Sequence, residues 1–455
     1  MGCFAHLIGS IESIYAIVSR LFRAFSFETI NMSFAGKPPY KKSASPSLSL
    51  FSASEYRAFL FTSGAWTFAW RALQVVIGFQ IYELTKNPLD LGWLGLLEAI
   101  PGLTLVLYGG HHADHHDRRF TVIWGRGALS ILSMVLAIVP LIGGVNSMPL
   151  LLGVAFLAAC VRAFADPAAA ALEGQIVPRD AAVQSGVMLG TAFQLMWAAG
   201  PAVSGFAYDI SGAVGTYGLI AAVGAYSTLA MFFVDKRPLP PVHEEVGAWQ
   251  SIRDGIKYVF SNQVLIASMA LDLFAVLFGG AVALLPVFAS DILKVGATGF
   301  GLLNAAPALG SLVVMIFALR YPPKHRAGRL LHIAVAGFGV SIILFGLSEN
   351  FLLSFVLLTM SGVCDGISVV TRRAINRLMV PHAMRGRVAA VSTVFIGSSN
   401  EIGAFESGFA ASIFGTARSV WLGGLLTLFV VATTAVKAPK LFNLDLEKAA
   451  SAPDV

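Results

Sequence analysis

The sequence is poor in charged residues and in cysteine. Only 12% of its 455 residues are Asp, Glu, Lys or Arg, whereas 56% are hydrophobic. About a quarter of the residues of a soluble protein are charged, so the composition excludes an ordinary soluble protein and indicates an integral membrane protein. The three cysteines, Cys3, Cys160 and Cys364, are too few and too scattered for a disulfide framework or a metal cage.

Enzyme motifs are missing as well. The chain contains no G-x-S-x-G, no H-E-x-x-H and no G-x-x-x-x-G-K-[ST], the patterns that mark a serine nucleophile, a zinc site and a phosphate-binding loop. Their absence argues against hydrolase chemistry and against an ATP-driven pump within this chain. We therefore expect no enzymatic activity and no cofactor.

Long apolar runs dominate the sequence, and twelve of them could cross a membrane as helices, which takes about 20 apolar residues each. The first six are expected near residues 57–82, 91–108, 120–142, 148–167, 184–208 and 214–234. The second six are expected near residues 263–290, 297–320, 329–348, 350–371, 388–414 and 416–436. The predicted fold is an all-α membrane protein with twelve transmembrane helices.

The spans divide the chain into five parts. We expect a cytoplasmic extension at 1–55, a six-helix bundle at 56–234, a linker at 235–262, a second bundle at 263–437 and a tail at 438–455. The extension could be disordered or form an amphipathic surface helix, with Met32 as an alternative start. In the linker, Trp249, Ile252, Ile256 and Val259 recur at helical spacing and predict an amphipathic helix. Most Lys and Arg residues outside the spans fall in the even-numbered loops or near the ends of the chain, which places both termini in the cytoplasm.

Two stretches of the sequence occur twice. Residues 94–103, LGLLEAIPGL, align with residues 300–309, FGLLNAAPAL, at an offset of 206. Residues 177–206 align with residues 380–409 at an offset of 203, and both segments end in Ser-Gly-Phe. Accidental similarity would not keep so nearly constant an offset, so we expect two pseudo-symmetric bundles related by a two-fold axis along the membrane normal. Such repeats place a transporter's substrate site at their interface, near mid-membrane.

A short charged turn, GGHHADHHDRR at residues 109–119, separates the second and third spans. It resembles the loop 2–3 signature of the major facilitator superfamily, G-x-x-A-D-R-x-D/G-R-R. The matching residues are Gly110, Ala113, Asp114, Asp117, Arg118 and Arg119, and His115 stands where the family usually has Arg. We expect glycine to let two helix ends approach and Asp114 to lie at a helix N-terminus, where free N–H groups stabilise an anion. The resemblance implies that these residues form a gating loop.

Four further stretches are similar to the branch of that superfamily that includes the bacterial enterobactin exporter. They read GFQIYELTKNPLDLGWLGLLEAIPGL, RAFADPAAAALEGQIVPRD, FQLMWAAGPAVSGF and NEIGAFESGFAA. The resemblance covers residues 55–440 and implies the major facilitator fold in the bacterial inner membrane. It also implies efflux of a small amphipathic molecule, such as a siderophore or a drug, driven by proton re-entry. The stretch AGPAVSG, with Gly200, Pro201 and Gly205, resembles the span 5 motif of antiporters.

The expected partners are therefore a small-molecule substrate, protons and membrane lipids, and we expect a monomer. The net charge of +6 reflects the basic cytoplasmic loops rather than nucleic-acid binding. Two alternatives stay open at this point. One is an uptake permease, because a rocking transporter is reversible; the other is a receptor or scaffold on the same fold that transports nothing.

Charged residues inside the spans are the candidates for the transport path, since each costs about 3 kcal/mol or more in hydrocarbon and usually faces a cavity. They are Arg71, Glu98, Arg162, Asp272, Asp365, Glu401 and Glu406. The offset of 203 carries Arg162 onto Asp365, which suggests an ion pair across the two bundles with Asp365 as a protonation switch. Glu98 precedes the helix-bending Pro101 by three residues and has the neutral Asn304 as its repeat partner. Fixed salt bridges that hold helices in register are the alternative role.

Four histidines crowd the charged turn: His111, His112, His115 and His116. Imidazole and carboxylate groups suit ions of the zinc class, yet the loop signature already accounts for the acidic positions, so we expect no metal site. His115, in place of a permanent Arg charge, could instead make loop gating sensitive to cytoplasmic pH.

Overall fold

The computed structural model describes residues 54–145, 147–239, 248–321, 325–381 and 384–447. The predicted extension 1–55, its alternative start at Met32 and the end of the tail lie outside these residues. The chain divides into two units, Met1–Arg57 and Ala58–Val455. Of the first unit only the first turn of α3 is described, so the account below concerns the second.

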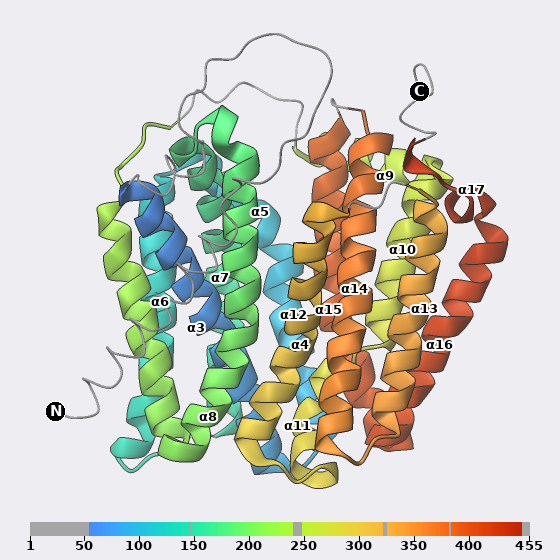
Figure 1. Cartoon of the computed structure of the whole chain (residues 1–455). Coiled ribbons are helices and arrows are strands. Elements are labelled where there is room, and N and C mark those ends of the chain that lie inside the picture. The colour runs from blue at the N-terminus through green and yellow to red at the C-terminus, as the bar shows by residue number, and fades with distance from the viewer. Residues whose placement is uncertain (1–53, 146, 240–247, 322–324, 382–383, 448–455) are drawn as a thin grey trace. The chain divides into compact units, whose positions relative to one another are not determined.

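Helices cover the described residues, and the long ones run roughly alongside one another (Figure 1). The first half of the chain forms α3 (Ser54–Thr85), α4 (Pro88–Thr104), α5 (Val106–His115), α6 (Arg118–Leu141), α7 (Met148–Ile176) and α8 (Ala182–Ala230). The second half forms α9 (Ala248–Ser261), α10 (Gln263–Phe278), α11 (Leu285–Val287), α12 (Gly296–Arg320), α13 (Ala327–Gly346), α14 (Phe351–Met379), α15 (Arg385–Phe414), α16 (Thr416–Lys437) and α17 (Pro439–Phe442).

Polar caps fix where several helices begin. The side chain of Asn87 accepts a hydrogen bond from the Leu89 amide at the start of α4, next to a proline that suits the first helical position. Asp117, Asn262 and Asn350 cap α6, α10 and α14 in the same way. These caps satisfy amide groups that have no partner within their own helix.

Three helices break where the sequence contains proline or glycine. The second predicted span is bent by 47° between α4 and α5, just after Pro101. The fifth and sixth predicted spans both lie within α8, which is interrupted by a kink at Gly212. The φ of 63° at this residue is unfavourable for residues other than glycine. The seventh span, predicted near residues 263–290, is not one continuous helix. Its first helix, α10, is followed by Gly279, and short helical turns continue up to Ile292.

By length and hydropathy, eight helices of the described residues qualify as membrane spans, and nine if α4 and α5 count as one bent span. One of the eight, Gln184–Phe233, includes the break at Gly212 and covers two predicted spans. The helices α3 and α15, which carry Arg71, Glu401 and Glu406, are not among the eight. A crossing number of twelve therefore stays a prediction, as do the domain boundaries.

The two halves of the chain meet along two helix pairs, α4 with α15 and α8 with α12. Glycine allows the close approach: a Cβ atom on Gly95 would lie 2.6 Å from Ala404 Cβ, and one on Gly301 would lie 3.1 Å from Gly205 Cα. These contacts mirror each other, because the offset of 206 carries Gly95 onto Gly301 and α4 onto α12. The repeats seen in the sequence thus lie where the halves pack together.

A buried arginine helps to join helices of the first half. Arg126 on α6 is 1% exposed, and its guanidinium donates to Thr62 Oγ1 on α3 and to the sulfur of Met231. Thr62 Oγ1 also lies 3.1 Å from Ser227 Oγ on α8. Arg126 therefore joins neighbouring helices of the first half by hydrogen bonds.

The linker ends in the predicted helix, α9, which packs against α15. Arg387 on α15 forms an ion pair of 3.2 Å with Asp254, and Val259 is 2% exposed. Ile256, predicted to lie on the apolar face of this amphipathic helix, is 41% exposed.

Two adjacent glycines of α5 provide a matched test of packing. A Cβ atom on Gly109 would lie 2.9 Å from the carbonyl carbon of Ala163 on α7, whereas one on Gly110 would have nothing within 4 Å. We expect Gly109→Val to destabilise the protein by about 1–3 kcal/mol through overpacking, and Gly110→Val to leave its stability nearly unchanged. Thermal unfolding in detergent, followed by size-exclusion chromatography, measures both. Equal losses in the two variants would mean that helix propensity, not the contact with α7, decides the outcome.

Candidate functional site

The charged residues predicted to line the transport path fall mainly into two groups. The first contains Arg71 on α3, Glu98 on α4, Arg162 on α7 and Glu401 on α15, which lie close enough for their charges to interact. The second contains Asp272 on α10 and Asp365 on α14. Six of the seven predicted path residues thus gather at two places.

Arg71 is connected to Glu98 through a glutamine. Its Nη1 donates to Gln74 Oε1 over 2.7 Å, and Gln74 Nε2 donates to Glu98 Oε2 over 2.7 Å. The guanidinium also lies over the ring of Trp197 on α8, 4.1 Å from its centroid. One relay therefore joins α3, α4 and α8. Gln74 was not among the residues predicted for the site, although its position three residues after Arg71 puts both on one face of a helix.

Arg162 pairs within its own helix. Its Nε lies 2.9 Å from Asp166 Oδ2, and Asp166 Oδ1 accepts a hydrogen bond of 3.0 Å from Trp66 Nε1 on α3. The Arg162 guanidinium lies over Trp70, 4.9 Å from the ring centroid. Asp166 was not among the residues predicted for the site, although it lies four residues after Arg162, where helical side chains meet.

The hypothesis of an ion pair between Arg162 and Asp365 is not met in this structure, where the partner of Arg162 is Asp166. The repeat offset places Arg162 and Asp365 at equivalent positions, each within its own half. Equivalence of this kind does not bring two side chains into contact.

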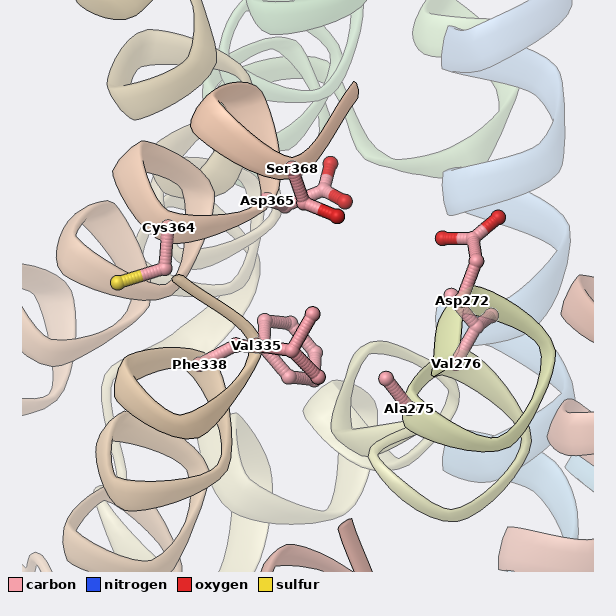
Figure 2. Close-up of a pocket in the computed structure, with 8 residues that line it drawn as sticks. All are labelled: Asp272, Ala275, Val276, Val335, Phe338, Cys364, Asp365 and Ser368. Carbon is pink, nitrogen blue, oxygen red and sulfur yellow. The ribbon is translucent and has the colours of Figure 1, made fainter. Parts of the chain in front are cut away.

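The second group lines a pocket between α10, α13 and α14. Figure 2 shows the carboxylates of Asp272 and Asp365 on opposite walls, above the apolar side chains of Val335 and Phe338. Asp272 forms an ion pair with Arg372 of α14. Arg372 had been placed outside the tenth span, because that span was predicted to end at residue 371, whereas α14 continues to Met379.

Glu406 joins neither group. It lies on α15 five residues after Glu401 and is only half-buried. Its predicted place on the transport path stays a prediction.

The charged turn is held by its arginines. Arg118 donates from Nε to the Ala113 carbonyl over 2.9 Å and pairs with Asp114 over 3.4 Å, while Arg119 donates to the Phe232 carbonyl over 3.1 Å. These bonds tie the turn to α5 and to the end of the sixth predicted span.

The aspartate that caps a helix in the charged turn is not the one expected. Asp114 lies in the last turn of α5 rather than at a helix N-terminus, and Asp117 is the residue that caps α6, accepting from the Phe120 amide over 3.1 Å. Burial acts to raise the pKa of Asp117, but Lys236, 3.0 Å away, and backbone amides together lower it below its usual value. Asp117 therefore stays ionised throughout the neutral range.

The span 5 motif packs two helices at once. A Cβ on Gly200 would lie 3.0 Å from the Phe68 carbonyl oxygen of α3, and Gly205 faces Gly301 of α12. The glycines of AGPAVSG therefore let α8 approach both the site and the other half of the chain.

Possible metal ligands lie together near the start of α13 and in the tail, away from both groups of charges. His325, Asp445 and Glu447 form a cluster in which His325 Nδ1 lies 2.9 Å from a Glu447 oxygen. Asp445 accepts from the Arg326 amide over 3.2 Å. These bonds connect the start of α13 to the tail.

Comparison with known proteins gives the family and the fold. The sequence profile of the family described as transmembrane secretion effector matches residues 45–454. The enterobactin exporter EntS of Escherichia coli O1:K1 / APEC is 24% identical over 335 residues, which cover 73% of this chain and 79% of that protein. EntS of Shigella boydii serotype 18 matches with the same figures.

Solved structures of transporters share the fold at low identity. A POT family transporter in complex with 5-aminolevulinic acid matches with a TM-score of 0.68 and 12% identity, over 85% of this chain and 96% of that one. The nucleoside transporter NupG matches with a TM-score of 0.67 and 14% identity, over 84% and 98%. A bacterial homologue of the lysosomal transporter Spinster matches with 0.64 and 13%, over 90% and 98%. The predicted all-α membrane fold is thereby confirmed.

Because the family profile spans nearly the whole sequence, and the fold is that of transporters rather than enzymes, the chain belongs to the transmembrane secretion effector family of the major facilitator superfamily and is a multi-pass membrane transporter.

Proposed function

We propose that the protein exports a small amphipathic molecule, of the siderophore or drug-like class, across the bacterial inner membrane in exchange for protons, with both termini in the cytoplasm. The observation that carries the proposal is the first group of charges: Arg71, Glu98 and Arg162 from one half of the chain and Glu401 from the other, which lie close enough for their charges to interact, with Glu98 buried. The relationship to enterobactin exporters supports efflux. An uptake permease and a non-transporting receptor are the alternatives.

The surroundings of the arginines favour a planar, oxygen-rich substrate. Each guanidinium lies over an indole ring, and two buried donors, Trp70 Nε1 and Arg71 Nε, have no hydrogen-bond partner among the described residues. An unsatisfied buried donor costs about 1–3 kcal/mol. A substrate with acceptor oxygens and a flat apolar body would satisfy these donors and stack between the indoles.

Charge balance supports proton coupling. When all are ionised, Arg71 and Arg162 face three carboxylates, Glu98, Glu401 and Asp166, which leaves one excess negative charge. Uncompensated charge is costly away from water, so one proton on a glutamate neutralises the group. A substrate whose hydroxyl groups donate hydrogen bonds to the ionised carboxylates favours loss of that proton, and binding of a new proton favours release of the substrate, as exchange requires.

The contacts between the halves support alternating access. Asp209, just before the break in α8, accepts from the amides of Ala297 and Thr298 at the start of α12, over 3.3 and 2.8 Å. Tyr82 at the end of α3 donates to Asp291. Both contacts lie at the end of the helices predicted to face outward.

At the ends predicted to face the cytoplasm, α4 and α15 carry glycines that meet no neighbouring helix among the described residues. A Cβ on Gly102 of α4, or on Gly386 or Gly397 of α15, would meet no atom within 4 Å. We therefore assign this conformation to the state that is closed outside and accessible from the cytoplasm.

The first test neutralises the acids. We expect Glu98→Gln and Glu401→Gln each to lower proton-driven export by about tenfold or more, equivalent to about 1.4 kcal/mol, because neither can release a proton. Efflux of labelled enterobactin or of ethidium from cells with and without the protein measures transport and its direction. Glu349→Gln, at an exposed site, is the matched control. Full activity of both neutral variants would refute the proposed coupling, and export of neither probe would refute the substrate class.

The second test opens the outer contact. In a background with serine at the three cysteine positions, Asn304→Cys reports on a residue that is 6% exposed, one turn beyond Gly301. We expect Asp209→Ala to speed its labelling by a membrane-impermeant maleimide added from outside about tenfold, since the variant cannot accept the two α12 amide bonds, each worth about 1 kcal/mol. Asp180→Ala, at an exposed position, should leave the rate unchanged. No difference between the two variants would mean that Asp209 does not hold the halves closed.

A further inference from the structure

The last turns of α5 present four histidines on one face. His111 and His115 are four residues apart, as are His112 and His116, so each pair stacks along the helix. The ring centroids lie 4.1 Å apart in the first pair and 4.0 Å apart in the second. His111, His115 and His116 are exposed, whereas His112 packs edge-on against Phe164 of α7.

The hydrogen bonds of the rings leave ligand atoms free. Nδ1 of His115 lies 2.9 Å from the His111 carbonyl oxygen, and Nδ1 of His116 lies 3.2 Å from the His112 carbonyl oxygen. A carbonyl oxygen only accepts, so Nδ1 carries the hydrogen and Nε2 of a neutral ring keeps its lone pair. A bond from the second ring nitrogen to a backbone carbonyl is the usual way in which proteins orient a metal-binding histidine.

The charges around the face also favour a cation. The rings lie at the C-terminal end of α5, where the helix dipole is negative. The neighbouring Arg118 is turned inward to the carbonyls of Ala113 and Ala171, and its side chain is only 9% exposed. The side chain of Asp114, beside the rings, is 63% exposed.

We propose that His111 and His115 bind one divalent transition-metal ion of the zinc class through their Nε2 atoms, with water completing the coordination shell. Imidazole nitrogen favours zinc, copper, nickel and cobalt over magnesium and calcium. The sequence had argued against a metal because the loop signature explains the acidic residues, but this pair needs no acidic ligand. A bound ion joins two side chains that lie one helical turn apart at the C-terminal end of α5, within the charged segment 109–119. This segment lies on the face proposed to be cytoplasmic.

Metal binding to the full-length protein tests the proposal without any transport assay. The protein is purified in detergent by a tag without histidine and titrated with Zn²⁺, with Co²⁺ as a spectroscopic probe and Mg²⁺ as a competitor. We expect saturable binding of Zn²⁺ that excess Mg²⁺ does not displace, and a rise in the thermal unfolding temperature. The variants His115→Gln and His111→Gln should each weaken binding at least tenfold and abolish that rise, because one ring cannot chelate.

Two control variants locate the site. His325→Gln removes the histidine of the exposed cluster with Asp445 and Glu447 and should leave Zn²⁺ affinity unchanged. The double variant His112→Gln/His116→Gln should reduce it less than the loss of His115. Equal affinity of wild type and His115→Gln overturns the proposal, as does loss of binding only in His325→Gln or only in the second-pair variant.

Discussion

The architecture depends on one constraint: charged side chains within apolar helices must be balanced by other side chains, since hydrocarbon offers them no water. Arg71 and Glu98 meet this constraint through Gln74, Arg162 through Asp166, and Asp272 through Arg372. The contacts of Gln74 with Glu98 and of Asp272 with Arg372 join different helices, α3 to α4 and α10 to α14. The charges of the group around Glu401 are only partly balanced by one another. This imbalance suits the exchange of protons for substrate that we propose.

The two halves of the protein share a plan but differ in their polar residues. The repeat carries Gly95 onto Gly301 and Pro201 onto Ala404, and both close contacts lie between halves. The repeat partner of Glu98, however, is Asn304, which donates to a carbonyl in its own helix. Packing between the halves is therefore nearly symmetric, whereas the charges are not. Each half therefore carries its own group of charges, and the two groups do not occupy equivalent positions.

Breaks in the helices lie close to these charges. Pro101 follows Glu98, and Gly279 and Gly280 follow Asp272, with Gly280 against Ser407 and Gly403 of α15. A broken helix can change its angle at a hinge more easily than a continuous one. The helices that contain the charged residues thus also contain the breaks that could serve as hinges for movement of the two halves.

The sequence by itself determined the approximate positions of the helices, the bend after Pro101, the internal repeat and the charged residues within the helices. These follow from local hydrophobicity and from residues whose backbone preferences are local. It did not determine which charges meet: Asp166, Gln74 and Arg372 were missed as partners, and Asp114 was expected at a helix N-terminus, a position that Asp117 occupies. Only the tertiary structure decided these points, because pairing depends on the depth and rotation of neighbouring helices, and neither quantity is encoded in the spacing of residues along one helix.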